Sequence, residues 1–315
     1  MKFKLAAAAI FASAAFLAAP SVQAEWKPSG PITLTIGFGP GGSTDTMGRL
    51  IAANIEKTRG WTVVVKNKGG GGGVVMLKGL MQKKPDGQNI GMAVSTGVVL
   101  AVATRKPAPF QLDSFDYLAT VATGHLVIVT QGVRPYNDIA GLIAFAKKNG
   151  GAAVASNGLT GNMLLKVLSK SSGVNLRAVP TKGGGEVMKQ LLGGHVAAGF
   201  DGGRHMRYMK DGTIKVLATL SRSRHPLAMN QKTLREQGFN YPVEPTWFAA
   251  APKGLPADVK ATLAKAFDDA INSDEVKKIV AKRLRMQVRN LGPEGTGKLI
   301  NEGLGSLNNL IAASK

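Results

Sequence analysis

The chain has 315 residues, 44% of them hydrophobic, and 40 Lys plus Arg against 19 Asp plus Glu, a net charge of +21. This length allows two domains, or one large domain, with a substantial buried core, which disfavours intrinsic disorder. The sequence has no cysteine, so disulfides, thiolate zinc sites and cysteine nucleophiles are excluded.

The N-terminus is typical of a secretory signal peptide. Lys2 and Lys4 precede an uncharged, mostly apolar run over residues 5–19, and Val22-Gln23-Ala24 resembles a signal-peptidase site. The run is shorter than the roughly 20 apolar residues that a transmembrane anchor needs. We therefore expect cleavage after Ala24 and a periplasmic protein, because an unanchored exported chain stays near a cell only where a second membrane confines it.

The positive charge is scattered along the chain. No run of five or more like charges occurs, and aromatic residues make up only 6%, few for stacking on bases. We therefore expect no nucleic-acid partner. A solvated basic surface, or attraction of small acidic ligands, explains the charge better.

Short β-branched runs alternate with helix-period segments in the first part of the chain. Residues 32–36, 61–65 and 88–94 are predicted strands, and helices are predicted around Met47 to Ile55 and over residues 74–83. This β-α-β-α-β order predicts a parallel sheet with helices on its faces.

A second unit of the same kind follows, and the chain then ends in helices. The predicted strands are 126–130, 152–155, 176–179, 196–200 and 215–220, with helices at 138–148, 162–170 and 186–192. An extended run at 246–251 precedes helices at 257–271, 274–283 and 293–312, which we expect to pack on the first unit. The predicted fold class is α/β with two lobes, residues 25–125 plus 246–315 and residues 126–245. A ligand is expected between them, off the carboxyl ends of the strands.

The turn after the first strand, Phe38-Gly39-Pro40-Gly41-Gly42-Ser43-Thr44-Asp45, leads directly into a helix. Its glycines let the backbone approach a ligand, and free amide groups at a helix start attract an anion. Ser43 and Thr44 add hydroxyl groups. The alternative is a plain glycine turn with Ser43 as helix cap.

The same turn contains the G-x-G-x-x-G pattern of dinucleotide-binding proteins. Lys66 and Asn67, however, stand where that pattern needs an acidic residue for the ribose, and Pro40 removes an amide donor. We therefore expect no nucleotide cofactor.

Three other strand ends carry small polar or glycine residues before a helix: Ser95-Thr96-Gly97, residues 156–161 and Thr181-Lys182-Gly183-Gly184-Gly185. Amide donors at such helix starts are unsatisfied. Each turn by itself fits plain capping, but four of them, two in each lobe, fit a ligand with two anionic ends. Lys182 either adds a charge to the site or is an exposed turn lysine.

The sequence shows no catalytic constellation. Ser43 lacks the closing glycine of G-x-S-x-G, and the four histidines have no zinc-binding spacing. Asp201 and His205, four residues apart, predict a surface contact, with a shared metal ion as the alternative. We expect neither an enzyme nor a metal or other cofactor. A secreted hydrolase or lyase, and an exported polyanion-binding module, remain as alternatives.

Several segments, in their order and spacing, are similar to one protein family over about residue 31 to the C-terminus. They are residues 38–45, Val63 to Gly69 with its glycine run, Lys84-Pro85-Asp86-Gly87, residues 182–185 and residues 191–196. They resemble the substrate-binding proteins of tripartite tricarboxylate transporters, also called Bug receptors. The resemblance implies a periplasmic flytrap fold, similar to type II binding proteins, that closes on a small mono-, di- or tricarboxylate, aromatic ones included. It also implies delivery to the permease subunits of a membrane transporter. A monomer is the simplest assumption.

By similarity, the ligand-binding residues come from both lobes. The first lobe supplies Phe38, Gly39, Gly42, Ser43, Thr44, Asp45, Ser95 and Thr96, and the second supplies Ser156, Asn157, Gly158, Thr160, Lys182, Gly183 and Asp201. The chain departs from the family at Met163, where a histidine is frequent, and at Thr181, where a tyrosine is frequent. Asp45, inside an anion site, is expected to cap its helix or to meet an ammonium group.

Overall fold

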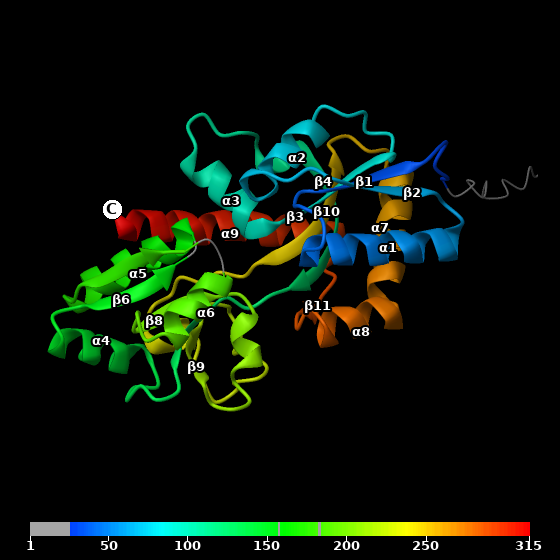
Figure 1. Ribbon diagram of the computed structural model, residues 1–315. Coiled ribbons are helices and arrows are strands. Elements are labelled where there is room, and N and C mark those ends of the chain that lie inside the picture. Colours follow the sequence, from blue (N-terminus) through cyan, green and yellow to red (C-terminus); the bar gives the residue numbers. More distant parts are fainter. Residues whose placement is uncertain (1–25, 157, 182–183) are drawn as a thin grey trace, which may run out of the picture.

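The computed structural model describes residues 26–156, 158–181 and 184–315, which form two β-sheets with helices packed against them (Figure 1). The strand order is β11-β4-β10-β3-β1-β2 in the first sheet and β7-β6-β8-β5-β9 in the second. This confirms the predicted α/β fold with two sheets flanked by helices.

The first sheet is parallel only in part. Its strands are β1 (Ile32–Ile36), β2 (Val63–Asn67), β3 (Asn89–Val94), β4 (Phe115–Thr123), β10 (Thr246–Pro252) and β11 (Gln287–Val288). β1 pairs in parallel with β2 and β3, as predicted, but β10 lies between β3 and β4 and runs antiparallel to both. The expectation of a parallel sheet was therefore incomplete, because β10 enters this sheet on its way back from the second one.

The second sheet combines the two kinds of pairing as well. Its strands are β5 (Val127–Gln131), β6 (Ala152–Ser156), β7 (Leu176–Pro180), β8 (Ala198–Asp201) and β9 (Ile214–Thr219). β6 is parallel to β7 and β8, whereas β5 is antiparallel to β8 and β9. β5 follows β4 directly, so one crossing of the chain between the sheets lies at residues 124–126.

The helices cover the faces of each sheet. α1 (Ser43–Arg59), α2 (Val74–Leu80), α3 (Ser95–Thr104), α7 (Ala257–Asn272) and α8 (Asp274–Lys282) lie with the first sheet, and α4 (Ile139–Lys148), α5 (Leu159–Ser172) and α6 (Gly184–Leu192) with the second (Figure 1). Among the described residues, none of the helices combines the length and the apolar character needed to span a membrane.

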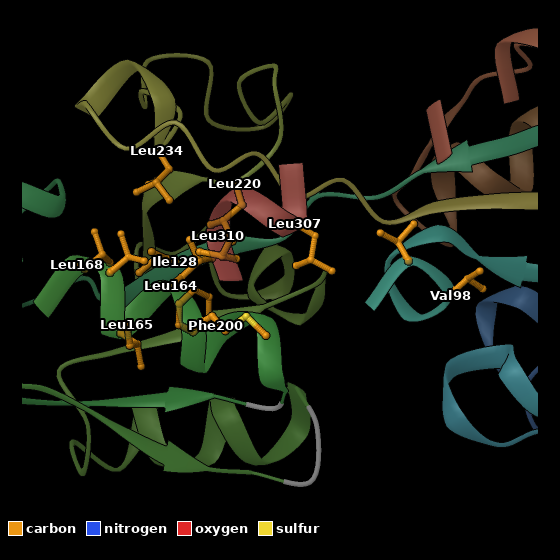
Figure 2. Close-up of a cluster of buried hydrophobic side chains, with 14 of the residues drawn as sticks. Val98, Ile128, Leu164, Leu165, Leu168, Phe200, Leu220, Leu234, Leu307 and Leu310 are labelled. Carbon is orange, nitrogen blue, oxygen red and sulfur yellow. The ribbon is translucent and has the colours of Figure 1, made fainter. Parts of the chain in front are cut away.

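The last helix, α9 (Gly292–Ser314), packs against elements that belong to both sheets. It contacts β4 and α3 and continues to α5. Figure 2 shows Leu310 of α9 among Ile128 of β5, Leu164 of α5 and Leu220, which directly follows β9. The expectation that all terminal helices pack on the first unit holds for α7 and α8. α9 differs because its 23 residues span about 35 Å and carry apolar side chains from Leu299 to Ile311, far enough to reach the second sheet's elements.

The glycine run before α2 has a conformational reason. Gly70, Gly71, Gly72 and Gly73 all have positive φ angles, 131°, 58°, 73° and 101°, which side chains with a β-carbon rarely adopt. A β-carbon on Gly97, at the start of α3, would lie 2.6 Å from the carbonyl oxygen of Gly72. The run therefore lets the backbone pass close to the start of α3, at the edge where the strands end.

Candidate ligand-binding site between the two sheets

Three helices begin at strand ends without a side-chain cap. The N-cap residues of α1, α3 and α5 are Gly42, Val94 and Gly158, and within the described residues no cap side chain accepts a hydrogen bond from these helices. In contrast, the side chain of Asp138 caps α4 and that of Ser273 caps α8. α1 and α3 belong to the first sheet and α5 to the second, so each side presents amide groups that an anion can accept from.

Thr44, in the first turn of α1, is already engaged within the protein. The indole Nε1 of Trp247 donates a hydrogen bond of 2.8 Å to its hydroxyl, and both residues are buried. Ser43 beside it is half-buried, and its hydroxyl has no hydrogen bond to the described part of the chain. Of the two hydroxyl groups expected at this turn, that of Ser43 is unpaired within the described part of the chain, and that of Thr44 is buried and accepts from Trp247.

The carboxylate of Asp45 fixes the turn before α1. It accepts hydrogen bonds from the amide of Gly41 (3.0 Å), Nε of Arg49 (3.0 and 3.1 Å) and Nδ2 of Asn67 (2.8 Å). Burial raises the pKa of Asp45, but the hydrogen bonds from Arg49, Gly41 and Asn67 outweigh it and hold the pKa at about 2. Both oxygens are thus taken by protein groups, and Asp45 ties the turn to β2.

Asn67 was not among the expected site residues, although it shapes the same turn. Its Nδ2 also donates to the carbonyl oxygen of Phe38 at 3.1 Å. The signal in the sequence was its position at the end of the second strand, where a dinucleotide-binding protein has an acidic residue. Here an amide takes that place and holds the backbone at Phe38.

Ser95, at the start of α3, holds the chain where it returns to the first sheet. Its hydroxyl donates to the carbonyl oxygen of Glu244 (3.3 Å) and accepts from the amide of Thr246 (3.1 Å). Ser95 also lines, with Thr96, a cavity of about 320 Å³ whose charged residues are Arg222, Glu244, Arg289, Lys298 and Glu302. Ser95 therefore lies beside the returning crossing of the chain.

Thr96 and Thr160, expected on opposite sides of the site, come together. Both line a cavity of about 40 Å³, with Tyr241, Pro242, Val243, Ser306, Leu307 and Leu310. The starts of α3 and α5 thus meet beside α9. Phe38, Gly39 and Gly42 line neither this cavity nor the one at Ser95.

The expected residues of the second sheet gather at the ends of β6, β7 and β8. Ser156 donates to the carbonyl oxygen of Gly158 at 3.3 Å and accepts from the amide of Thr181 at 2.9 Å with its own carbonyl. A β-carbon on Gly184 would lie 2.7 Å from Oδ1 of Asp201. Asn157, Lys182 and Gly183 lie outside the described residues. The departure at Met163 falls in the core, since its side chain is buried.

The pairing of Asp201 with His205 was expected at the surface, and this was wrong. Nδ1 of His205 lies 2.6 Å from Oδ2 of Asp201, and the two side chains are 0% and 1% exposed. Asp201 ends β8 and His205 lies in a short 3-10 helix (Arg204–Arg207), so the four-residue spacing does not mark a helix face here.

Two further histidines lie against this pair. The rings of His205 and His225 are 5.1 Å apart, as are those of His125 and His225. Burial, with smaller contributions from His205 and His125, lowers the pKa of His225 to about 3. The pKa of Asp201 is lowered because hydrogen bonds from His205 and Gly203 outweigh its burial. No group of three or more potential metal ligands with suitable geometry occurs in the described parts of the chain.

Comparisons with known proteins agree with this architecture. The family model described as "Tripartite tricarboxylate transporter family receptor" matches residues 47–315. The chain is 31% identical to Protein BugT of Bordetella pertussis over 279 residues, which cover 86% of this chain and 85% of BugT. It is 30% identical to a UPF0065 protein of Cupriavidus necator, covering 82% and 80% of the two chains.

Solved structures of similar proteins share the fold. The periplasmic binding protein BugD superposes with a TM-score of 0.70 at 27% identity, covering 91% of this chain and 98% of BugD. MatC from Rhodopseudomonas palustris, with bound malate, has a TM-score of 0.70 at 22% identity, covering 90% and 100%. An R. palustris protein with adipate has a TM-score of 0.73 at 20% identity, covering 91% and 98%. Together with the family match, these findings show that the chain belongs to the receptors of the tripartite tricarboxylate transporter family, the periplasmic solute-binding proteins of the Bug type.

Proposed function

We propose that this receptor captures a small carboxylate between two lobes and delivers it to a tripartite tricarboxylate-type membrane transporter. The lobes proposed are residues 25–125 with 246–315, which contain all strands of the first sheet, and residues 126–245, which contain those of the second. The solute is held at the carboxyl ends of the strands, where the four glycine-rich or polar turns lie.

The observation that carries this proposal is the uncapped starts of α1, α3 and α5 on the two sides. Free amides and the positive end of a helix dipole stabilise an anion placed there. α2, α7 and α9 also lack a side-chain cap. At the start of α2 the amide of Val75 already donates to the carbonyl oxygen of Gly70, and a proline removes one amide donor at Pro256, the N-cap of α7, and at Pro293 in the first turn of α9.

The class of solute is supported by charge and by the structural neighbours. Cleavage after Ala24 removes Lys2 and Lys4 and leaves a net charge of +19, which favours the approach of anions over cations. MatC and the R. palustris protein hold malate and adipate, both of which are dicarboxylates. A dicarboxylate has two anionic ends, which suits amide groups offered from two sides.

An enzyme on the same scaffold is disfavoured by the surroundings of His205 and His225. Nucleophilic hydrolases place a hydroxyl or thiol within hydrogen-bonding distance of the base. The nitrogens of His205 instead face Asp201 and His225, and Nδ1 of His225 accepts from the amide of Leu227. The ring nitrogens of His205 and His225 are thus hydrogen-bonded to each other, to Asp201 and to the backbone, and none of them pairs with a hydroxyl group in the described part of the chain.

The test is a binding screen of the mature protein with mono-, di- and tricarboxylates, by thermal shift and then by calorimetry. A bound carboxylate stabilises the native state, by about 2.7 kcal/mol at a hundredfold excess over Kd. If no carboxylate shifts the melting temperature, the proposal is wrong. A shift seen only with heparin or DNA and abolished by salt supports the polyanion-binding alternative, and turnover of a bound compound supports the enzyme.

The turn before α1 is tested by Ser43→Ala. The hydroxyl of Ser43 is free for a ligand, so its loss is expected to weaken binding of the best carboxylate about tenfold or less without altering stability. The matched control is Ser172→Ala, because Ser172 donates only to the carbonyl of Leu168 within α5. An unchanged affinity of Ser43→Ala removes this hydroxyl from the site.

Export and delivery have separate tests. N-terminal sequencing of the protein from the periplasm is expected to begin at Glu25, as cleavage after Ala24 requires. Uptake of the bound carboxylate into cells is expected to need both this receptor and the permease subunits. Uptake that persists without the receptor contradicts delivery.

A further inference from the structure

The two carboxylate oxygens of Asp201 have very different surroundings. Oδ2 accepts three hydrogen bonds, from the amide of Gly203 (2.9 Å), the amide of His205 (2.8 Å) and Nδ1 of His205 (2.6 Å). Oδ1 is buried and has no hydrogen-bond partner in the described structure, and the side chain of Asp201 is 1% exposed. A buried charged oxygen without a donor is costly, so Oδ1 calls for a donor from outside the protein.

A chain of hydrogen bonds fixes the protons on the histidines behind Asp201. The amide of Leu227 donates to Nδ1 of His225 at 3.1 Å, so the single proton of the neutral His225 ring is on Nε2. Nε2 of His225 lies 3.3 Å from Nε2 of His205, which must therefore accept. The proton of His205 is then on Nδ1 and is donated to Oδ2 of Asp201.

Asp201 is an ionised carboxylate at neutral pH, because the hydrogen bonds at Oδ2 outweigh its burial and lower its pKa. Its free oxygen can only accept hydrogen bonds, and it repels a second carboxylate. Oδ1 lies at the start of α6, where a β-carbon on Gly184 would come within 2.7 Å. A hydroxyl or an ammonium group is the chemistry that satisfies such an oxygen.

We propose that His225 and His205 position Asp201 so that its Oδ1 binds a hydroxyl or ammonium group of the solute, and that the receptor thereby selects hydroxy- or aminocarboxylates over the unsubstituted acids. Asp201 makes this contact, and the two histidines act through it as positioning residues. The inference rests on the proposed function, because it specifies which carboxylates the site prefers.

The experiment compares matched pairs of acids by calorimetry with the full mature receptor. Malate and succinate differ by one hydroxyl, lactate and propionate by one hydroxyl, and glutamate and glutarate by one ammonium. The substituted acid of at least one pair is expected to bind about ten- to a hundredfold more tightly, as a hydrogen bond to a charged group implies. If the pairs bind with equal affinity, or the unsubstituted acids bind better, the inference is wrong and the proposed function stands. If none of these acids nor any other carboxylate binds, the proposed function itself fails.

Variants of His225 separate positioning from a general structural role. Glutamine places an amide nitrogen near the site of Nε2 and keeps the donor to His205, whereas asparagine is too short to reach it. His225→Gln is therefore expected to keep the preference and His225→Asn to reduce it toward one, with both variants checked by thermal unfolding. Equal preferences in two folded variants contradict the positioning role.

A second arm does not depend on the histidines. Gly184→Ala places a methyl group against Oδ1 and is expected to abolish the preference, whereas at Gly185 a β-carbon meets only the Arg204 side chain, at 3.8 Å or more, so Gly185→Ala is expected to keep it. Asp201→Asn is expected to reduce the preference to one or below, because the three donors at Oδ2 keep the amide oxygen there and the amide nitrogen replaces Oδ1. A full preference in Gly184→Ala and in Asp201→Asn overturns the assignment of Oδ1.

Discussion

The indole Nε1 of Trp247 donates a 2.8 Å hydrogen bond to the hydroxyl of Thr44, 203 positions earlier in the chain. Trp247 lies in β10, the strand that returns from the second sheet, and Thr44 lies in the first turn of α1. The start of α1, one of the proposed anion-binding turns, is therefore held by the segment that connects the two sheets.

Removing either partner of this bond is expected to destabilise the fold. Trp247→Phe leaves the buried hydroxyl of Thr44 without its partner and a space beside it, and Thr44→Val leaves the indole N–H of Trp247 without an acceptor. Each is expected to lower the free energy of unfolding by about 1–3 kcal/mol. The double variant is expected to cost less than the sum of the two, because neither unpaired group then remains. Urea unfolding of all four proteins measures this. Strictly additive losses would show that the two side chains do not interact.

The lowered pKa of Asp45 predicts an acid-sensitive contribution to stability. The pKa falls from 3.8 to about 2 on folding, so the stabilisation is fully present above pH 4 and is lost as the pH falls through about 2. Asp45→Asn is expected to lower the free energy of unfolding by about 1–3 kcal/mol at neutral pH. It should also show a shallower decline than the wild type between pH 4 and 2. Urea unfolding at a series of pH values tests both, and parallel declines of the two proteins contradict the assignment.

The lowered pKa of His225 predicts that the free energy of unfolding also depends on pH in a less acidic range. Its pKa falls from 6.5 to about 3 on folding. Between these pH values the ring is protonated in the unfolded chain and neutral in the folded protein. Stability is therefore expected to decline as the pH falls from about 6.5 toward 3. His225→Gln removes this titration and is expected to flatten that part of the profile. His195→Gln, the same change at an exposed histidine, is the control for the substitution itself. Equal slopes in wild type and His225→Gln would falsify the role of this ring.

The close approach of Gly72 and Gly97 predicts opposite effects of two glycine-to-alanine changes in helices. Gly97→Ala brings a methyl group 2.6 Å from the carbonyl oxygen of Gly72 and is expected to cost about 1–3 kcal/mol. Gly305→Ala in α9 has no neighbour within 4 Å and is expected to stabilise by up to about 1 kcal/mol through helix propensity. Thermal or urea unfolding compares the two. A neutral Gly97→Ala means that the glycine run can move away from α3.

The sequence predicts most elements because their apolar residues follow the period of a strand or a helix. The strand at residues 32–36 has the predicted bounds, and α1 covers the expected helix. β4 was not predicted, and α3 was expected only as a helix of unstated length after Ser95-Thr96-Gly97. β4 is buried at every position, and α3 is apolar on most of its surface, so neither shows the periodicity by which strands and helices are recognised.

The contacts within the candidate site are less predictable than the elements. The turns before α1, α3 and α5 follow from glycine and hydroxyl residues at strand ends, which is local information. The partner of Thr44 depends on how β10 returns, and that of His205 on a histidine twenty positions later in a loop. Such pairings are set by the packing of distant segments, which no spacing in the sequence records.

Helix α9 limits how the two sheets can rotate relative to each other. Because Leu307 and Leu310 are buried beside elements of the second sheet, pulling that sheet away would expose them, at a cost of about 1.5–3 kcal/mol for each leucine. A change of the inter-sheet angle that keeps these leucines covered must slide α5 along α9. The packing of α5 on α9 is therefore expected to resist rotation of the two sheets, together with the two segments that connect them.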